Sequence, residues 1–371
     1  MSGEWGSDDE NGTGIPVLRT TNFSNEGIVN YNDIVTRIIT KKNIDEKYLR
    51  KGDIIIEKSG GSDKLPVGRV IYFDGNENTY LFNNFTGLLR VQNQEIWYPK
   101  YVFYSLFANY KRGGTRPFEN RTTGLHNLKT DDYVSRYEIA DINKKDQVSI
   151  CKKLDKLQGI IKLREQELQL LNDLIRARFV EMFGDPVHND KGWATDFVEG
   201  LCKEIYGGGT PSKSHPEYYE NGNIPWVSAK DMKTEILTDS QIHINQEGVA
   251  NSTTKVVPEN SVIMVIRSGI LKHTLPVAIN AVPITINQDL KAFIPGIRVL
   301  TRFLAYQFKM MESDILAGVR AVTADNIEFK TLRKRKLIVP PIKLQEQFAT
   351  FVTEVDKSKV ILPKSSFNVI I

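Results

Sequence analysis

Residues 145–183 read KDQVSICKKLDKLQGIIKLREQELQLLNDLIRARFVEMF, and this stretch decides how the chain is organised. Apolar residues recur every seven positions in two registers, and Glu, Gln, Lys or Arg fill most other positions. The first register consists of Leu154, Ile161, Leu168, Ile175 and Met182. The second consists of Ile150, Leu157, Arg164, Leu171 and Arg178. At 1.5 Å per residue the stretch predicts a helix roughly 58 Å long. Such a helix needs a partner to cover its apolar seam.

The end of this helix is also marked in the sequence. Gly184-Asp185-Pro186 combines a glycine stop with a proline that cannot continue a helix. The arginines at 164 and 178 weaken a coiled coil, but they can fix its register or face a partner protein. An ordinary long core helix is the alternative interpretation.

Composition limits the class of protein. The chain has 371 residues, 40% of them hydrophobic and 25% charged, which is typical of a soluble protein with room for two domains. Its net charge of +4 permits nucleic-acid binding without indicating it. Two cysteines and five scattered histidines argue against a disulfide framework and a zinc hydrolase. Without a long apolar run or a signal sequence, we expect a cytoplasmic protein that does not bind membranes.

The sequence on either side of the long helix is repeated. Five short matches occur in the same order, with an offset that drifts from about 210 to 200 residues. They pair Ile15-Pro16 with Ile224-Pro225, Ile54–Gly60 with Ile263–Gly269, Leu65–Val67 with Leu275–Val277, Asn127 with Asn326, and Gln147 with Gln347. The second match sets Lys58 opposite Arg267. The chain therefore reads as module, helix, module, helix.

A second, shorter helix is predicted over about 343–362, after Pro340-Pro341 and before Pro363. Its apolar stripe consists of Leu344, Phe348, Phe351, Val355 and Leu362. If a two-fold axis relates the repeats, the two helices pack antiparallel and separate the modules like a spacer. In the first module we also expect strands at 54–56 and 65–73, a helix at 97–110, and loops at 58–62 and 111–121.

Catalytic motifs are hard to find. Gly207-Gly208-Gly209-Thr210-Pro211-Ser212-Lys213 fails as a phosphate-binding loop, because Ser212 precedes the lysine and Pro211 lacks an N–H. The only Pro-Pro, at 340–341, has no neighbouring amide or carboxylate of the kind that amino-methyltransferases use. We find no persuasive catalytic or metal-binding set, although a stand-alone methyltransferase or nuclease stays open as an alternative.

Polar and basic loop residues are the candidates for contact with nucleic acid. A cation, a hydroxyl and a glycine after a buried strand can approach a phosphate or base edge closely. The candidates are Lys58, Ser59, Arg112, Arg116, Arg121, Thr210, Lys213, Lys230, Arg267, Ser268 and Arg320. A solvated loop charge is the alternative for each of them, as it is for the basic run at 330–336. Candidates for helix or partner contacts are Leu154, Leu157, Ile161, Leu168, Leu171, Ile175, Phe348, Phe351 and Val355.

These features together resemble the specificity subunit of type I restriction-modification systems. The resemblance covers nearly the whole chain, and its motifs lie at Gly14–Phe23, Thr122–Leu125, Arg178–Pro186, Gly207–Pro211, Glu220–Val227 and Ile338–Gln347. It implies an α+β fold in which two pseudo-repeated α/β target recognition domains are separated by two long antiparallel helices forming a coiled coil. We expect domain 1 at 1–143, the central helix at 144–184, domain 2 at 185–338, and the distal helix and tail at 339–371.

The resemblance also implies a function. Each domain would read one half of a bipartite, asymmetric double-stranded DNA target, and the helices would set the spacer and dock two methyltransferase subunits. The chain itself would be non-catalytic and hold no cofactor. Partner subunits would use S-adenosylmethionine for adenine methylation, and added restriction subunits would use ATP and Mg²⁺ to translocate and cleave DNA.

Two departures from the family pattern give further alternatives. The first module has little to match Trp193–Tyr206, so an edge strand is expected to be missing, and the second helix stops early before the tail Lys364–Ile371. Both are typical of a recombined or truncated specificity allele with weakened partner docking. A coiled-coil adaptor that binds only proteins is the remaining alternative.

Overall fold

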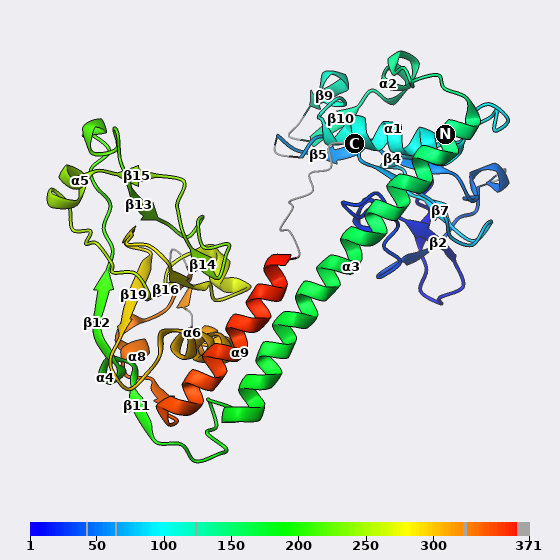
Figure 1. Ribbon diagram of the computed structural model, residues 1–371. Helices are drawn as coiled ribbons and strands as arrows, with labels where there is room; N and C mark the ends of the chain where they lie inside the picture. The colour runs from blue at the N-terminus through cyan, green and yellow to red at the C-terminus, as the bar shows by residue number, and fades with distance from the viewer. Residues whose placement is uncertain (42–43, 64, 123–124, 319, 322–324, 362–371) are drawn as a thin grey trace. The chain divides into compact units, whose positions relative to one another are not determined.

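A computed structural model describes residues 1–41, 44–63, 65–122, 125–318, 320–321 and 325–361 (Figure 1). The chain divides into two compact units, unit 1 over Met1–Arg164 and unit 2 over Glu165–Pro363. The division falls inside the longest helix, α3 (Lys144–Phe183). The predicted long helix is therefore confirmed, and each half of it belongs to a different unit. The predicted tail at 364–371 lies outside the described residues.

Unit 1 combines three small sheets with two short helices. Its sheets run β6-β4-β8, β1-β3-β2-β7 and β5-β10-β9. The strands are β1 (Ser7–Asp8), β2 (Ile15–Leu18), β3 (Val35–Ile38), β4 (Ile54–Glu57), β5 (Ser59–Gly61), β6 (Val70–Tyr72), β7 (Leu81–Phe82), β8 (Thr86–Leu89), β9 (Glu119–Thr122) and β10 (Leu125–Leu128). The helices are α1 (Pro99–Lys111) and α2 (Thr130–Arg136), and the 3₁₀ turns are η1 (Thr20–Asn22), η2 (Asp45–Lys47) and η3 (Arg116–Phe118).

The core of unit 1 forms around β4, whose three isoleucines are fully buried. β-Branched residues suit a strand that is covered on both faces. Helix α1 packs on this sheet, and the rings of Phe103 and Tyr72 are 5.6 Å apart. The expected helix at 97–110 is thus confirmed within two residues, whereas the expected strand at 65–73 is limited to β6.

Unit 2 has the same kind of framework with more strands. Its sheets run β12-β19-β16-β17-β14, β15-β13-β18, β11-β22 and β20-β21. The strands are β11 (Thr195–Phe197), β12 (Cys202–Gly207), β13 (Ile224–Val227), β14 (Ile236–Leu237), β15 (His243–Ile244), β16 (Val262–Val265), β17 (Val277–Asn280), β18 (Thr285–Ile286), β19 (Leu290–Pro295), β20 (Arg320–Ala321), β21 (Asp325–Asn326) and β22 (Lys336–Ile338). The helices are α4 (Val198–Leu201), α5 (Gln246–Ala250), α6 (Thr301–Met310), α7 (Glu312–Leu316), α8 (Phe329–Arg333) and α9 (Ile342–Ile361), with turns η4 (Pro216–Tyr218) and η5 (Gly269–Lys272).

Strand pairing confirms the internal repeat. In unit 1, β2 pairs in parallel with β7, and Val17 lies opposite Leu81. In unit 2, β13 pairs in parallel with β18, and Trp226 lies opposite Thr285. The next residues repeat a backbone hydrogen bond, from Asn83 N to the Leu18 carbonyl and from Asn287 N to the Val227 carbonyl. The two units share this parallel strand pairing and the hydrogen bond that follows it.

A buried glutamine near the start of each long helix provides the clearest repeat. Gln147 Oε1 accepts from Tyr98 N at 2.8 Å, and its Nε2 donates to the carbonyls of Ile96 and Ile142. Gln345 Oε1 accepts from Leu300 N at 2.9 Å, and its Nε2 donates to the carbonyls of Arg298 and Pro340. The pairing of Gln147 with Gln347 was wrong, because Gln347 is exposed and Gln345 makes the equivalent contacts.

The match between Lys58 and Arg267 was also wrong, by one residue. The amides of Lys58 and Ser59 both donate to the Phe85 carbonyl, and those of Ile266 and Arg267 both donate to the Asp289 carbonyl. Ser59 is therefore the counterpart of Arg267. The sequence match was displaced by one residue because a cation, a serine and a glycine follow the apolar strand in both repeats. Ser59 lies in β5, not in the expected loop at 58–62.

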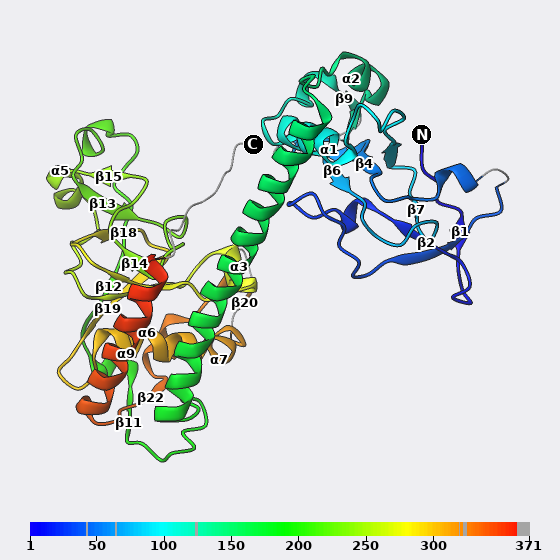
Figure 2. The same cartoon turned by 45° about the vertical axis from the view of Figure 1, so that its right-hand side comes forward.

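Within unit 2, α9 packs antiparallel to the last part of α3 (Figures 1 and 2). The contact is aromatic: the Phe348 ring lies 5.4 Å from Phe179 and 5.7 Å from Phe183. Further along α9, Phe351 faces Arg178, which confirms the antiparallel direction. The second helix was predicted within one residue at its start, and Leu362 of its expected stripe lies outside the described residues.

Burial along α3 departs from a continuous coiled-coil seam. Ile175 is buried with Phe348 and Val355 in the core of unit 2, and Leu171, Phe351 and Leu344 pack against that core. Leu154 packs instead on the core of unit 1, whereas Leu157 is 46% exposed. The early part of the seam is therefore used partly for domain packing, because Gln147 and Cys151 face unit 1.

Replacing Gln345 with alanine should lower the free energy of unfolding of unit 2 by about 2–4 kcal/mol, because buried backbone groups lose their partners. Gln347→Ala is the matched control two residues away and should change this free energy by less than about 0.5 kcal/mol. Urea unfolding followed by circular dichroism checks both variants. Equal losses of unfolding free energy in the two variants would contradict the assignment of Gln345 as the counterpart of Gln147.

Candidate nucleic-acid interface

The candidate interface in unit 2 is built around Arg267, which follows β16. Its Nη2 lies 2.6 Å from Asp289 Oδ1, and its Nε donates to the same oxygen at 2.7 Å. The side chain is 47% exposed. Asp289 itself is held by Asn287, whose Nδ2 donates to Asp289 Oδ2 at 3.0 Å. The guanidinium is thus oriented and still accessible to a ligand.

The glycine-rich loop after β12 lies beside this ion pair. A Cβ at Gly208 would stand 1.9 Å from the Asn287 carbonyl oxygen, so only glycine permits this approach. Gly209 N donates to the Ile286 carbonyl, and the Gly209 carbonyl accepts from Trp226 Nε1 at 3.0 Å. Thr210 Oγ1 then donates to Gln288, next to Asp289. The glycines serve close backbone packing, which agrees with the rejection of a phosphate-binding loop.

In both units a β-hairpin from later in the chain pairs with the residue that comes after the central strand, β4 or β16. In unit 2, Arg267 bridges to Asn326 of β21, which pairs with Arg320 of β20. In unit 1, Ser59 of β5 pairs with Asn127 of β10, and the neighbouring His126 pairs with Arg121 of β9. The backbones of Arg121 and Arg320 thus lie one strand beyond Ser59 and Arg267, on the far side of β10 and β21, and their side chains lie outside the described part. Ser268 accepts from Ile270 N as the cap of η5.

The candidates in unit 1 are held by polar contacts. Lys58 Nζ donates to Ser2 Oγ at 2.8 Å. Partial burial, opposed by the Asp131 carboxylate, lowers the pKa of Lys58. Arg116 donates to the Asp63 carbonyl oxygen at 3.3 Å. The expected single loop at 111–121 was wrong, because α1, η3 and β9 divide it.

Three of the predicted residues stand apart from these groups. Arg112 caps the C-terminus of α1. Lys213 is exposed beyond the glycine-rich loop, and Lys230 is exposed in the turn after β13. Their side chains lie on separate loops. Thr210, Arg267 and Ser268 are brought together in unit 2, with the Arg320 backbone one strand away. In unit 1 the Arg121 backbone likewise lies one strand away from Ser59.

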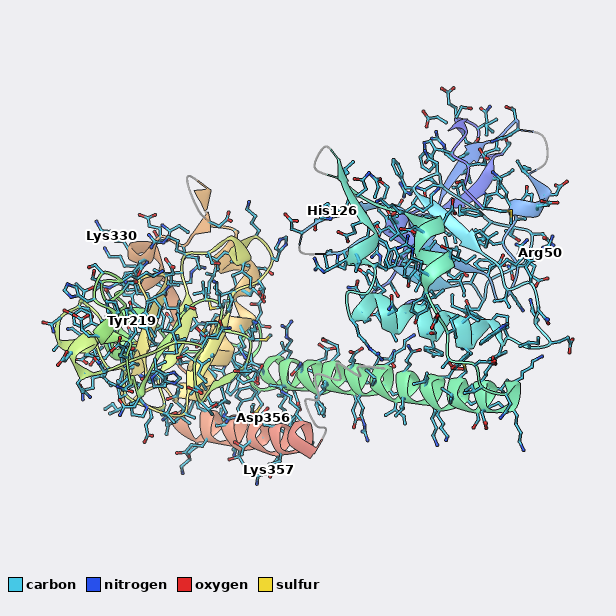
Figure 3. All side chains as sticks on the ribbon, turned by 90° about the horizontal axis from the view of Figure 1, so that it is seen from above. Arg50, His126, Tyr219, Lys330, Asp356 and Lys357 are labelled. Atoms are coloured by element: carbon cyan, nitrogen blue, oxygen red, sulfur yellow. The ribbon has the colours of Figure 1, made fainter. Side chains whose placement is uncertain are left out.

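Several contributing residues were missed. Asp289 and Gln288 follow β18 with no motif to mark them, and only their pairing with Arg267 and Thr210 shows their place. His126 of β10, labelled in Figure 3, is buried, and its Nδ1 lies 2.9 Å from Glu119 Oε2 across the hairpin. Glu119 also accepts from Val67 N at 3.0 Å. These carboxylates were overlooked because charged loop residues are usually solvated.

Helix α3 offers a different kind of surface. Its exposed apolar residues are Ile150, Leu157, Ile160, Leu163, Leu170, Leu174 and Val180. Exposed leucines on a helix indicate a surface that a protein partner can cover. Ile161 and Leu168 are partly buried, whereas Ile175, Phe348 and Val355 are buried inside unit 2 and serve its core.

Two chemical properties can be stated for the described residues. None of their helices is both long and apolar enough to cross a bilayer. They also contain no group of three or more His, Cys, Asp or Glu side chains that is arranged to hold a metal ion.

Comparison with known proteins places this framework in a family. The model of the type I restriction modification DNA specificity domain matches residues 4–173 and again 190–370. The chain is 40% identical over 159 residues to the Escherichia coli type I restriction enzyme EcoR124I/EcoR124II specificity subunit, covering 42% of this chain and 39% of that protein. It is 29% identical over 174 residues to the Methanocaldococcus jannaschii MjaIX specificity subunit, covering 45% of this chain and 38% of that one. These alignments span about two fifths of the curated relatives.

Solved structures share the fold at low sequence identity. A structure of the type I restriction-modification system S subunit from M. genitalium matches with a TM-score of 0.55 at 14% identity, over 98% of this chain and 88% of that one. A structure described as the basis of complex assembly and conformational transition of the type I system matches with a TM-score of 0.53 at 14% identity, over 96% and 87%. Two pseudo-repeated recognition domains on an α+β framework are thus the observed fold.

Replacing Trp226 with phenylalanine should loosen the glycine-rich loop, because the Gly209 carbonyl loses its indole donor. We expect a loss of about 1–3 kcal/mol in the free energy of unfolding and faster amide exchange at 208–210. Hydrogen-exchange mass spectrometry measures the local effect. Trp97→Phe in unit 1 is the control, and unchanged exchange in Trp226→Phe would refute the role of this bond.

Proposed function

Because the chain belongs to the type I restriction-modification DNA specificity family, we propose that each of its units reads one half of a bipartite, asymmetric DNA target. The single observation that carries this proposal is one framework built twice with different side chains at the same strand end. Ser59 stands in unit 1 where Arg267 stands in unit 2. A guanidinium only donates hydrogen bonds and suits guanine, whereas a hydroxyl can donate or accept and suits several base edges, so the two half-sites should differ.

The proposed DNA contacts fall into two groups. Arg267, Ser268, Thr210 and Arg320 in unit 2 are the candidates for reading bases, as are Ser59 and Arg121 in unit 1. Lys58, Arg112, Arg116, Lys213 and Lys230 are the candidates for phosphate contacts, which position a protein without reading sequence. The Arg267 guanidinium supports its role best, since its planar fork is oriented by Asp289 and suits the two acceptors of guanine.

The proposed protein partners are two methyltransferase subunits docked on the helices, joined by restriction subunits in the complete assembly. The exposed leucines of α3 support this docking, because such side chains are costly to leave in water. This chain would hold no cofactor and carry out no catalysis. The partner subunits would use S-adenosylmethionine, ATP and Mg²⁺, and the complex would act in the cytoplasm. The domain limits at 143, 184 and 338 remain predictions.

A test of the DNA proposal uses the chain assembled with its methyltransferase subunits. Arg267→Gln should weaken binding by about 1–3 kcal/mol, or roughly 5- to 150-fold, and relax the target sequence in one half-site only. Methylome sequencing and DNA-binding titrations measure the two effects. Arg298→Gln is the control, since Arg298 is exposed but paired with Asp196 beside α4. Changes in both half-sites, or in neither, would contradict the proposal.

The salt dependence of the same titrations separates this function from that of a coiled-coil adaptor. Neutralised phosphates release counterions, so binding should fall steeply as salt concentration rises. If the chain were an adaptor that binds only proteins, the complex would bind DNA with the same salt dependence as the methyltransferase subunits alone.

A heptad inserted into α3 between Lys162 and Glu167 should change the spacer between the half-sites and leave the half-sites themselves. Residues 162–167 are exposed, so the insertion avoids the packed parts of both units. Seven residues lengthen a helix by about 10 Å, which is on the order of three base pairs. Methylome sequencing of the variant gives the spacer directly. An unchanged spacer would exclude the helix as a ruler.

A further inference from the structure

A lysine ammonium occupies the same place in both units, although the lysine belongs to a different strand in each. The amides that follow the central strand donate to the Phe85 carbonyl in unit 1 and to the Asp289 carbonyl in unit 2. Two residues further on, Gly87 of β8 and Lys291 of β19 are therefore counterparts, and both pair with the central strand. Unit 1 has no lysine at this position of β8, but Lys58, which follows β4, takes its place.

The side chain of Lys58 runs along this glycine. A Cβ on Gly87 would stand 3.1 Å from Lys58 Cδ, so the lysine stem passes the point where the Lys291 side chain begins in unit 2. Lys58 Nζ donates to Ser2 Oγ at 2.8 Å, and Ser2 bridges to Gly87. The ammonium thus lies against the residue that is paired with Gly87.

The ammonium of Lys291 lies at the equivalent point of unit 2. Gly207 of β12 pairs with Lys291, as Ser2 pairs with Gly87. A Cβ on Gly207 would lie 2.9 Å from Lys291 Nζ. The same Nζ lies 4.8 Å from the ring centre of Phe329, the first residue of α8. In both units the ammonium therefore contacts the residue opposite position 87 or 291.

Within the described part of the chain, no carboxylate forms an ion pair with either ammonium. Burial lowers the pKa of Lys291, as it does that of Lys58, where the Asp131 carboxylate opposes the effect. A partly buried ammonium is costly to leave without a counter-charge, so an anion supplied by a ligand would offset that cost.

Both lysines stand beside the residues proposed to read bases. Ser59 follows Lys58 directly. Asp289, which orients the Arg267 guanidinium, lies two residues before Lys291 on the way into β19. An anion bound at either ammonium would therefore lie next to the base-reading group of the same unit.

We propose that Lys58 and Lys291 form one repeated anchor, in which each ammonium binds a phosphate of the DNA backbone beside its own half-site. This inference rests on the proposed function and deepens it by naming a phosphate contact that the two units share. The base-reading groups differ between the units, whereas the anchor keeps one charge at one place, as a backbone of constant chemistry requires. Lys291 was missed in the sequence because it lies within a strand and not in a loop.

The test uses the chain assembled with its methyltransferase subunits and two duplexes of equal length, one carrying the sequence that the complex methylates and one of unrelated sequence. Lys291→Met keeps an apolar stem over Phe329 and removes the charge, so circular dichroism should show an intact fold. We expect the slope of log affinity against log salt concentration to become shallower by about one for both duplexes. The methylated sequence should stay the same.

Lys309→Met is the matched control. Lys309 Nζ lies 4.8 Å from the ring centre of Tyr306, but it is also paired with Glu235 at 2.7 Å. Its loss should leave the salt slope unchanged. An unchanged slope in Lys291→Met, an equal change in Lys309→Met, or a weakening confined to the methylated duplex would each overturn the anchor.

Moving the charge between strands tests the equivalence of the two lysines. Lys58→Ile should make the salt slope shallower by about one, and adding Gly87→Lys, which copies Ile266 and Lys291, should restore it. A side chain fits at Gly87 once the Lys58 stem is gone, because the next neighbour, Ile56 Cγ2, would lie at 3.4 Å. A folded double variant that stays as weak as Lys58→Ile would overturn the equivalence. A wild-type complex with no preference for the methylated duplex would instead refute the proposed function, and the salt slopes would still test the anchor.

Discussion

A buried glutamine joins each recognition unit to its long helix, and the rest of the framework depends on that joint. Gln147 and Gln345 are each fully buried, and each satisfies three backbone groups that would otherwise lose water without gaining a partner. Each glutamine lies in the first turn of its long helix, α3 or α9. Its side chain joins that turn to the residues before the domain helix, α1 or α6, and to the loop that precedes the long helix. Leucine or glutamate at this position lacks the combined donor and acceptor.

Around this joint the two units conserve backbone geometry and vary side chains. The parallel pairing of β2 with β7 returns as that of β13 with β18. The strand ends that carry Ser59 and Arg267 receive the same pair of amide hydrogen bonds. A shared framework fixes where a loop residue stands, and its chemistry is then free to change. This division between frame and loop is what the proposed reading of two different half-sites requires.

The sequence predicted the long-range organisation well, because helices and repeats leave periodic signals. Both long helices were placed within one or two residues, and the repeat of Ile15-Pro16 at Ile224-Pro225 matched the observed pairing. Finer matches failed where short polar motifs recur by chance. Gln345 and Gln347 both fit the pattern, and only burial separates them. The seam of α3 was predicted as one interface, but Leu154 and Ile175 pack in different units, a choice that tertiary packing makes.

The candidate site was predicted less completely for a physical reason. A basic residue after a strand, such as Arg267, can be recognised in the sequence. The carboxylate that orients it, Asp289, lies more than twenty residues later and belongs to no motif. Strand ends determine which loops meet, so Asp289 and Thr210 join Arg267 only after the sheet has formed. Lys213 and Lys230, which looked equivalent by composition, remain on separate loops.

In the proposed role of Arg267 as a DNA-reading residue, its pairing with Asp289 would have a kinetic consequence during a search along DNA. A carboxylate beside the arginine repels phosphates, so a random stretch of duplex gains little from this residue and is released quickly. Where acceptors of the right spacing occur, the guanidinium keeps its orientation and gains two partners at once. Discrimination then appears in the residence time, with short stays on wrong sequences and a long stay on the right one.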